Sequence, residues 1–316
     1  MSALIQVQNL SKSFSGFLAI QDINFEIQPH QIVGLLGLNG AGKSTILKIL
    51  GTFLLPSSGE VTIDGLDLEN SVHQVRERFG YLPDTPPLYD EMEVEEYLIF
   101  VCALKNVTKS NRQLYVDEAI HKTNLKEVRS CLIRELSHGF RQRVGIAQAI
   151  VHKPKLIILD EPINGLDPVQ IVEMRDLILS LKKDHTVLLS SHILSEITKT
   201  CDQILIIDRG RLVAKGTQES LLNQAQQSIN IRCEVKDGEK SVDLSAKIKN
   251  IPGCLSVKEK KLNLNLVFEV HASSDLRPQL ARLIIHSEVD LLSLTKTELG
   301  LENVFMKIVQ NSTSIK

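Results

Sequence analysis

The chain of 316 residues is 43% hydrophobic and 23% charged, which is the balance of a soluble globular protein with room for one large or two modest domains. Its formal net charge of -2, without any block of Lys and Arg, excludes a strongly basic nucleic-acid-binding protein. No nucleic-acid partner is therefore expected.

The cysteines, the N-terminal segment and the length of the apolar runs argue against four further features. The five cysteines are odd in number and form no CxxC pair, which argues against a zinc site or a disulfide framework. Residues 1–7 lack the basic start and apolar core of a secretory signal, and no apolar run approaches the ~20 residues of a membrane-spanning helix. We therefore expect reduced thiols and a membrane connection only through a partner.

The first part of the chain alternates predicted strands and helices. Apolar and polar residues alternate in two segments, as in strands with one solvated face, and a mostly apolar run before Gly37 is typical of a buried strand. Apolar residues then recur at helical spacing after residue 93. The predictions are strands at 4–7, 23–27, 31–36 and 61–63, a helix at 45–50, and a mainly helical subdomain at about 85–152.

Strands return in the next part of the chain, at 156–159, 186–191 and 203–207, and a turn at 208–210 predicts a hairpin with 212–214. A polar, Gln-rich segment at 218–228 predicts a short helix and linker between domains 1–217 and 229–316. Beyond it the expected elements follow the order βαββαβ of a ferredoxin-like unit. They are strands at 229–235, 255–260, 262–270 and 291–296, helices at 244–249 and 276–287, and a final helix at 301–309.

Residues 37–44 read Gly-Leu-Asn-Gly-Ala-Gly-Lys-Ser and fit G-x-x-x-x-G-K-[ST] between a predicted strand and a helix. Glycines let the backbone wrap a polyphosphate with its N–H groups inward, and the helix N-terminus adds positive charge. Lys43 is expected to reach the β- and γ-phosphates, and Ser44 to ligate Mg²⁺. The predicted nucleotide-binding residues are Gly37, Leu38, Asn39, Gly40, Ala41, Gly42, Lys43, Ser44 and Thr45.

An apolar strand at 156–159 ends in two carboxylates, Asp160 and Glu161. In P-loop enzymes an Asp at such a strand end helps to hold Mg²⁺. Glu161 is placed to polarise an attacking water, because a general base must lie within hydrogen-bond reach of the proton that it accepts. Asp160 is therefore predicted as a metal ligand and Glu161 as a catalytic residue.

Residues 136–143, Leu-Ser-His-Gly-Phe-Arg-Gln-Arg, precede that strand and open a predicted helix. The segment resembles the signature Leu-Ser-x-Gly-x-x-Gln-Arg of ATP-binding-cassette (ABC) ATPases, and the resemblance extends in order over residues 1–217. It implies an α/β P-loop cassette with a mixed RecA-like core sheet, an antiparallel β subdomain and a helical subdomain. It also implies an adenine-stacking Phe14, a loop 164–167 ending in Asp167 (the D-loop), and a catalytic switch residue, His192.

The resemblance also implies two partners. In the family the helix that begins at Ser137 and Gly139 faces the ATP of a second subunit, so one chain makes half of each site and two copies enclose two ATPs. Members of this kind work with a separate transmembrane permease, which implies a peripheral location on the cytoplasmic side of the membrane. The expected function is ATP binding and hydrolysis that drives dimer closure and powers transport.

The sequence departs from the family pattern at three positions. His138 and Phe140 replace the common Gly and Gln of the signature, and Asp84 stands where the family's Q-loop carries Gln. Asp84 is shorter and, when ionised, only an acceptor, but a carboxylate suits a hard cation; it is expected to contact Mg²⁺ and to take part in catalysis. Residues 80–89 and the segment 300–307 resemble export systems for drugs, polysaccharides and gliding motility.

Several alternatives remain at this stage. A cassette of this kind can act as a mechanical or regulatory switch on a membrane complex without moving a solute. A ribosome- or DNA-associated cassette is disfavoured because the chain has one cassette and no long coiled coil. A kinase or GTPase is disfavoured by the signature segment and by the lack of Asn-Lys-x-Asp.

Overall fold

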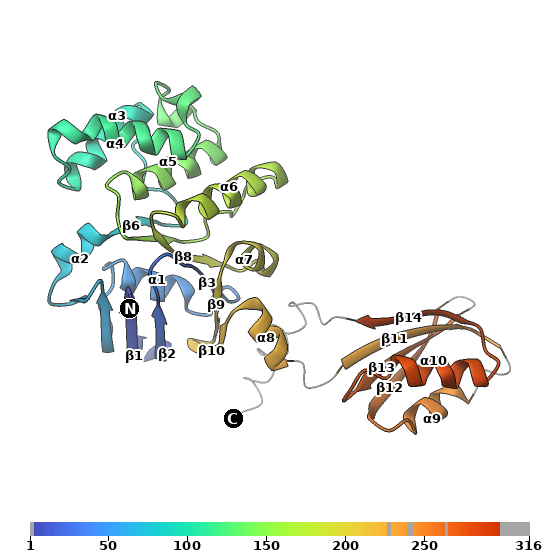
Figure 1. The fold of residues 1–316 in the computed structure, drawn as a ribbon. Coiled ribbons are helices and arrows are strands. Elements are labelled where there is room, and N and C mark those ends of the chain that lie inside the picture. The colour runs from blue at the N-terminus through green and yellow to red at the C-terminus, as the bar shows by residue number, and fades with distance from the viewer. Residues whose placement is uncertain (1–2, 226–228, 239–242, 263–264, 298–316) are drawn as a thin grey trace. The chain divides into compact units, whose positions relative to one another are not determined.

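The computed structural model describes residues 3–225, 229–238, 243–262 and 265–297. The chain divides into two compact units, Met1–Gln218 and Glu219–Lys316 (Figure 1). The final helix predicted at 301–309, and the segment 300–307 that resembles export systems, lie outside the described residues.

The first unit contains a six-stranded sheet in the order β10-β9-β3-β8-β7-β6. Five of these strands are parallel, and β10 pairs antiparallel with β9. Strands β3, β7 and β8 are buried along their whole length, as strands covered on both faces are. The strands are β3 (Ile32–Leu36), β6 (Phe79–Leu82), β7 (Leu156–Leu159), β8 (Thr186–Ser191), β9 (Gln203–Asp208) and β10 (Arg211–Gly216).

An antiparallel sheet, β2-β1-β4-β5, completes the core of this unit. Side chains of both sheets and of helix α1 (Lys43–Leu50) share one hydrophobic cluster. Register shifts interrupt the pairing of β1 with β2, and the predictions at 4–7 and 23–27 therefore caught only parts of longer strands. The strands are β1 (Ile5–Phe14), β2 (Phe17–Ile27), β4 (Ser58–Ile63) and β5 (Leu66–Asp67).

The predicted helical subdomain is present as three packed helices, which Figure 1 shows as a green layer at one end of the unit. They are α3 (Val94–Leu104), α4 (Lys109–Lys122) and α5 (His138–Ile150). Further helices of this unit are α2 (Val72–Arg78), α6 (Pro168–Leu181) and α7 (Leu194–Thr200). Helix α8 (Gln218–Ala225) begins at the boundary between the units and belongs almost entirely to the second. Helices α2, α6 and α7 were not among the predicted elements.

The second unit has an antiparallel sheet in the order β12-β13-β11-β14. Two helices contribute to the same hydrophobic cluster as β11 and β13, so both cover one face of this sheet (Figure 1). The observed element order is βαββαβ, while the classification as ferredoxin-like stays a prediction. The elements are β11 (Ile229–Lys236), α9 (Leu244–Lys249), β12 (Cys254–Leu262), β13 (Asn265–Ala272), α10 (Arg277–His286) and β14 (Leu291–Thr297).

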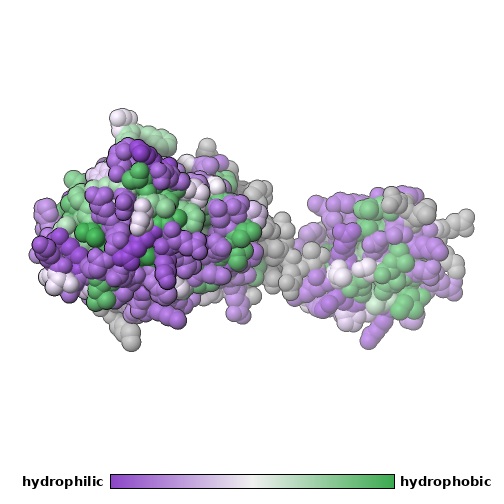
Figure 2. All heavy atoms as spheres, turned by 90° about the horizontal axis from the view of Figure 1, so that it is seen from above, coloured by the Kyte–Doolittle hydropathy of each residue, from purple (hydrophilic) through white to green (hydrophobic). Residues whose placement is uncertain are grey.

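Hydrophilic residues dominate the face of the first unit that Figure 2 shows, with apolar residues scattered between them. Among the described residues, no helix combines the length and apolar character that a membrane crossing requires.

Candidate functional site

A cavity of about 510 Å³ lies where the loops after β3, β7 and β8 meet. These three strands are parallel neighbours, so their carboxyl ends share one edge of the sheet, the usual place for a ligand in an open α/β fold. The volume of the cavity falls in the range of small-molecule sites. The lining residues are Phe14, Phe17, Ala19, Leu38, Asn39, Gly40, Gly42, Lys43, Ser44, Thr45, Asp84, Glu161, Asn164 and His192.

The loop 37–42 connects β3 to α1 in a conformation that depends on glycine. A Cβ at Gly37 would stand 2.5 Å from the carbonyl oxygen of Ile207, and Gly42 has a φ of +110°. Lys43 folds back over the loop, and its Nζ donates to the carbonyl oxygen of Gly37 at 2.8 Å. The loop is therefore wrapped around its own lysine, with the helix N-terminus directly behind it.

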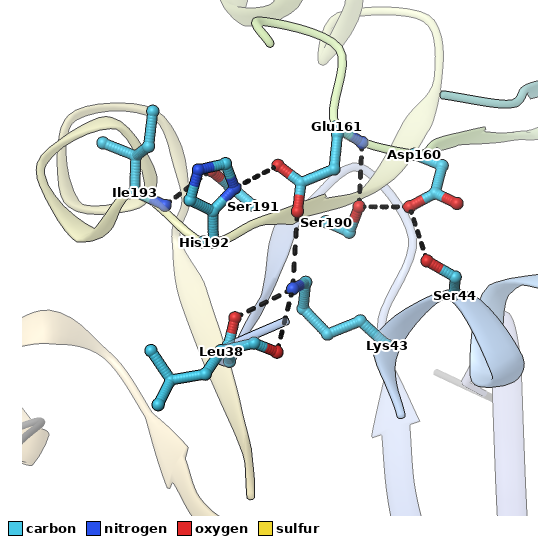
Figure 3. Close-up of polar contacts among 10 residues, drawn as sticks. Leu38, Lys43, Ser44, Asp160, Glu161, Ser190, Ser191, His192 and Ile193 are labelled. Carbon is cyan, nitrogen blue, oxygen red and sulfur yellow. Dashed lines mark hydrogen bonds and ion pairs between the residues drawn. The ribbon is translucent and has the colours of Figure 1, made fainter. Parts of the chain in front are cut away.

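Asp160 lies at the end of β7 and is buried beside Ser44 and Ser190. The Ser190 hydroxyl donates to Asp160 Oδ1 at 2.6 Å, and the Ser44 hydroxyl lies 3.5 Å from the same oxygen (Figure 3). Burial raises the pKa of Asp160, and the charges of Glu161 and Asp84 act in the same direction, while the two hydroxyls oppose the shift. A cation at this position would relieve the buried negative charge.

Glu161 is held between the phosphate loop and the end of β8. One carboxylate oxygen lies 3.4 Å from Lys43 Nζ, and the other accepts a hydrogen bond from His192 Nδ1 at 2.9 Å (Figure 3). Its backbone N–H donates to Ser190 Oγ at 2.8 Å, and its φ is +48°, a left-handed conformation that is unusual outside glycine. The predicted catalytic pair, Glu161 and His192, is thus in direct contact.

Two aromatic residues mark the other end of the cavity. Phe14 and Phe17 are paired across the turn between β1 and β2, so their side chains leave the same face of the hairpin. Phe14 is 42% exposed and Phe17 is 71% exposed, and Lys12 Nζ lies 5.3 Å from the Phe14 ring centre. An exposed aromatic face at this place can stack on a nucleobase without reading its hydrogen-bonding edge.

The oxygen atoms near Ser44 fit a small hard cation. Ser44 and Asp160 are adjacent, and Asp84 lines the same cavity. Among the residues that the structure describes, no group of three or more His, Cys, Asp or Glu side chains could hold a metal without help. A hydroxyl and one or two carboxylates are a donor set that Mg²⁺ could use, because this ion usually binds through one or two carboxylates together with water and substrate phosphates.

Three predicted nucleotide-binding residues lie away from this cavity. Ser137 and Gly139 line a different depression, between α5 and α6. Ser137 is the N-cap of α5 and accepts from the Phe140 N–H, while Asp167 caps α6 by accepting from the N–H groups of Val169 and Gln170. One chain therefore brings the phosphate loop, the acidic pair and His192 together, but not the signature residues.

Sequence reasoning missed several residues of the site. Ser190 supports both Asp160 and Glu161, and Asn164 and Phe17 line the cavity. Ser190 is the penultimate residue of β8, and polar residues at the carboxyl ends of buried parallel strands are a signal that could have identified it. Phe17 could have been found from its position opposite Phe14 across the turn residues 15–16.

Comparisons with known proteins identify the family of the chain. The family model described as ABC transporter matches residues 20–164. The bacitracin transport ATP-binding protein BcrA of Bacillus licheniformis is 30% identical over 315 residues, or 99% of each chain. The lipopolysaccharide export system ATP-binding protein LptB of Haemophilus influenzae is 33% identical over 228 residues, covering 70% of this chain and 95% of LptB.

Solved structures match about two thirds of the chain. A structure described as the ATP-binding subunit of an ABC transporter is 32% identical, with a TM-score of 0.64, and the match covers 70% of this chain and 92% of that one. A dimeric bacterial ABC transporter cassette, MJ0796, is 23% identical with a TM-score of 0.62 over 67% of this chain and 98% of its own, and supports the fold. The predicted cassette fold is confirmed. The chain belongs to the ABC transporter family as an ATP-binding subunit that hydrolyses ATP.

Proposed function

We propose that this chain powers an exporter by closing as a two-fold dimer around two ATP molecules and passing that motion to a separate transmembrane permease. The observation that carries the proposal is the separation of Ser137 and Gly139 from the cavity that holds Lys43 and Glu161. In a two-fold dimer, one chain can supply the phosphate loop of a site and the other chain its signature helix. This would explain why the two surfaces lie apart in a single chain.

Within that site the roles follow from the contacts. Lys43 and the loop N–H groups bind the β- and γ-phosphates, and Phe14 stacks on the base. Ser44, Asp160 and Asp84 would hold Mg²⁺, which neutralises phosphate charge when bound. Glu161 accepts the proton of the attacking water, and His192 orients the Glu161 carboxylate through its 2.9 Å hydrogen bond.

In the opposite subunit, the Ser137 hydroxyl and the α5 N-terminus would meet the γ-phosphate. A helix start offers unpaired N–H groups and a positive dipole end to an anion. Ser137 is exposed in the single chain and so is available to a second copy. ATP would favour the closed dimer because only that state brings both sets of groups onto one phosphate.

The role in transport is proposed from the similarity to named relatives. The similarity to BcrA extends through the second unit, and the names of BcrA and LptB describe transport and export. The contact with the permease is assigned to the helical subdomain and the loop 84–95, where Tyr89 is exposed and packs against Tyr97 and Phe100. With that contact, the chain is expected on the cytoplasmic side of the membrane.

The test is to purify the chain with its membrane partner, reconstitute the complex in vesicles and measure ATP-dependent solute flux. Outward flux in cells, or flux into inverted vesicles, supports export. ATP-driven dimerisation and hydrolysis without flux for any solute exported by related systems would instead favour a mechanical or regulatory switch on a membrane complex.

A further inference from the structure

His138, at the start of α5, contacts the D-loop (residues 164–167) of its own chain. Its Nε2 lies 3.1 Å from the carbonyl oxygen of Asn164. A carbonyl can only accept, so the ring nitrogen must carry the proton and donate. A Cβ on Gly165 would stand 3.2 Å from the same Nε2, which shows that the ring packs directly on two consecutive D-loop residues.

The two ends of this contact belong to different surfaces. His138 is flanked by Ser137 and Gly139, which line the depression between α5 and α6. Asn164 lines the cavity that contains Lys43 and Glu161. The hydrogen bond therefore joins the surface proposed to meet a second subunit's ATP to the site proposed to bind the chain's own ATP.

A short series of contacts continues from Asn164 to the predicted catalytic residues. The Asn164 N–H donates to the carbonyl oxygen of Glu161 at 3.1 Å, and the Glu161 carboxylate accepts from His192. A displacement of the D-loop at Asn164 would thus also displace the backbone of Glu161, which already has a positive φ. The position of the general base depends on how this loop is held.

Helix α5 has further ties to the element that follows the D-loop. Arg143 donates to Glu173 of α6 at 2.6 Å, and a Cβ on Gly139 would stand 2.8 Å from Gln170 Oε1. Helices α5 and α6 therefore contact each other through side chains of their first two turns. His138 extends the contacts of α5 into the D-loop itself. The ring is exposed in the single chain, so its removal need not disturb the core.

We propose that His138 is a positioning residue that couples the two ATP sites of the dimer: binding of a second subunit's ATP at Ser137 and Gly139 fixes the start of α5, and the His138 hydrogen bond transmits that position to Asn164 and Glu161. This inference rests on the proposed two-fold dimer. It assigns to His138 a function in the timing of hydrolysis, not in the binding of nucleotide to the chain's own site.

The test compares His138→Leu, which keeps apolar bulk without a donor, with His138→Gln, whose side-chain amide can donate from a similar reach. Both are made in the full chain, and steady-state hydrolysis is measured against ATP concentration. A net hydrogen bond corresponds to a change of about two- to tenfold in an equilibrium or rate. His138→Leu should lower kcat by about that factor and move the Hill coefficient towards 1, and His138→Gln should restore both.

Nucleotide binding and thermal unfolding serve as controls. The Kd for a fluorescent ATP analogue, measured at protein concentrations too low for dimerisation, and the melting temperature should match those of wild type in both variants. A His138→Leu chain with wild-type kcat and Hill coefficient overturns the inference, as does a loss that His138→Gln does not repair.

Failure of the underlying dimer is recognised separately. A Glu161→Gln chain in ATP and Mg²⁺ is followed by light scattering. If it stays monomeric and wild-type hydrolysis per chain is independent of protein concentration, the two-fold site itself is wrong and the coupling falls with it. If it dimerises and His138→Leu behaves as wild type, only the inference about His138 is refuted.

Discussion

Replacement of Glu161 by Gln tests the assignment of the general base most directly. Gln keeps the size of the side chain and can still accept the hydrogen bond from His192 Nδ1, but it cannot take a proton from water. A positioned general base contributes about 10²–10⁴ to a rate, which corresponds to roughly 3–5 kcal/mol in the activation barrier. We expect kcat to fall by about that factor.

The contact between Lys43 and Glu161 predicts how the Gln variant binds ATP. Lys43 Nζ lies 3.4 Å from Glu161 and must turn to the phosphates when ATP enters. Because the Gln variant lacks the competing charge, its Kd for ATP should equal that of wild type or decrease. Phosphate release gives kcat, and equilibrium binding of a fluorescent ATP analogue gives Kd.

A matched control is Glu60→Gln, at an exposed position on β4, which should hydrolyse ATP at the wild-type rate. The assignment is refuted if Glu161→Gln retains more than about a hundredth of the wild-type kcat, since a base contribution below about 10² lies outside the range for such a residue. Equal losses of kcat and binding would instead indicate damage to the phosphate loop.

Three other predictions concern the base-binding end, the helical subdomain and the core. Phe14→Ala should raise the KM for ATP by about five- to 150-fold, because stacking is worth about 1–3 kcal/mol per base. Phe14→Tyr keeps an aromatic ring and should preserve KM. An unchanged KM in the Ala variant would contradict the role of Phe14. Hydrogen bonds from Arg129 lower the pKa of Glu95 to about 2 from 4.5, so this pair contributes stability that is fully present above about pH 4.5 and is lost as the pH falls towards 2. Arg129→Met should therefore reduce the melting temperature at pH 7 more than at pH 3, and equal reductions at both would count against the pair. Gly80→Ala would place a Cβ 1.8 Å from the carbonyl oxygen of Ala149. Chemical denaturation should therefore show a loss of at least about 3 kcal/mol in unfolding free energy. A loss below about 1 kcal/mol would mean that β6 and α5 separate easily.

Much of the cassette could be predicted because its signals are local. The phosphate loop has fixed spacing, and β7 and β8 are short apolar runs that end in polar residues at the site. Helix α6 was missed although Asp167 and Pro168 form a typical N-cap and first helical position, because the segment was interpreted only as the D-loop. Strands β1 and β2 were predicted too short because their irregular register breaks the alternation on which the prediction depended.

The contacts that hold the site together could not be predicted from spacing. The pairing of Lys43 with Glu161, the support of Asp160 by Ser190, and the His138 contact with Asn164 each join segments far apart in the chain. They depend on the order of parallel strands in the sheet, which places the ends of β3, β7 and β8 side by side. Residue types indicated the chemistry, whereas the tertiary fold decides which groups meet.

The left-handed backbone of Glu161 has a consequence for engineering. A non-glycine residue in this conformation costs of the order of 1 kcal/mol, and Ser190 and the two flanking strands must hold it there. Screening a library at position 161 for heat resistance alone would therefore enrich Gly or Asn, residues that tolerate the conformation but bring no carboxylate. Thermostabilised variants of this chain should be selected with turnover as a second criterion, because at this position the two properties favour different side chains.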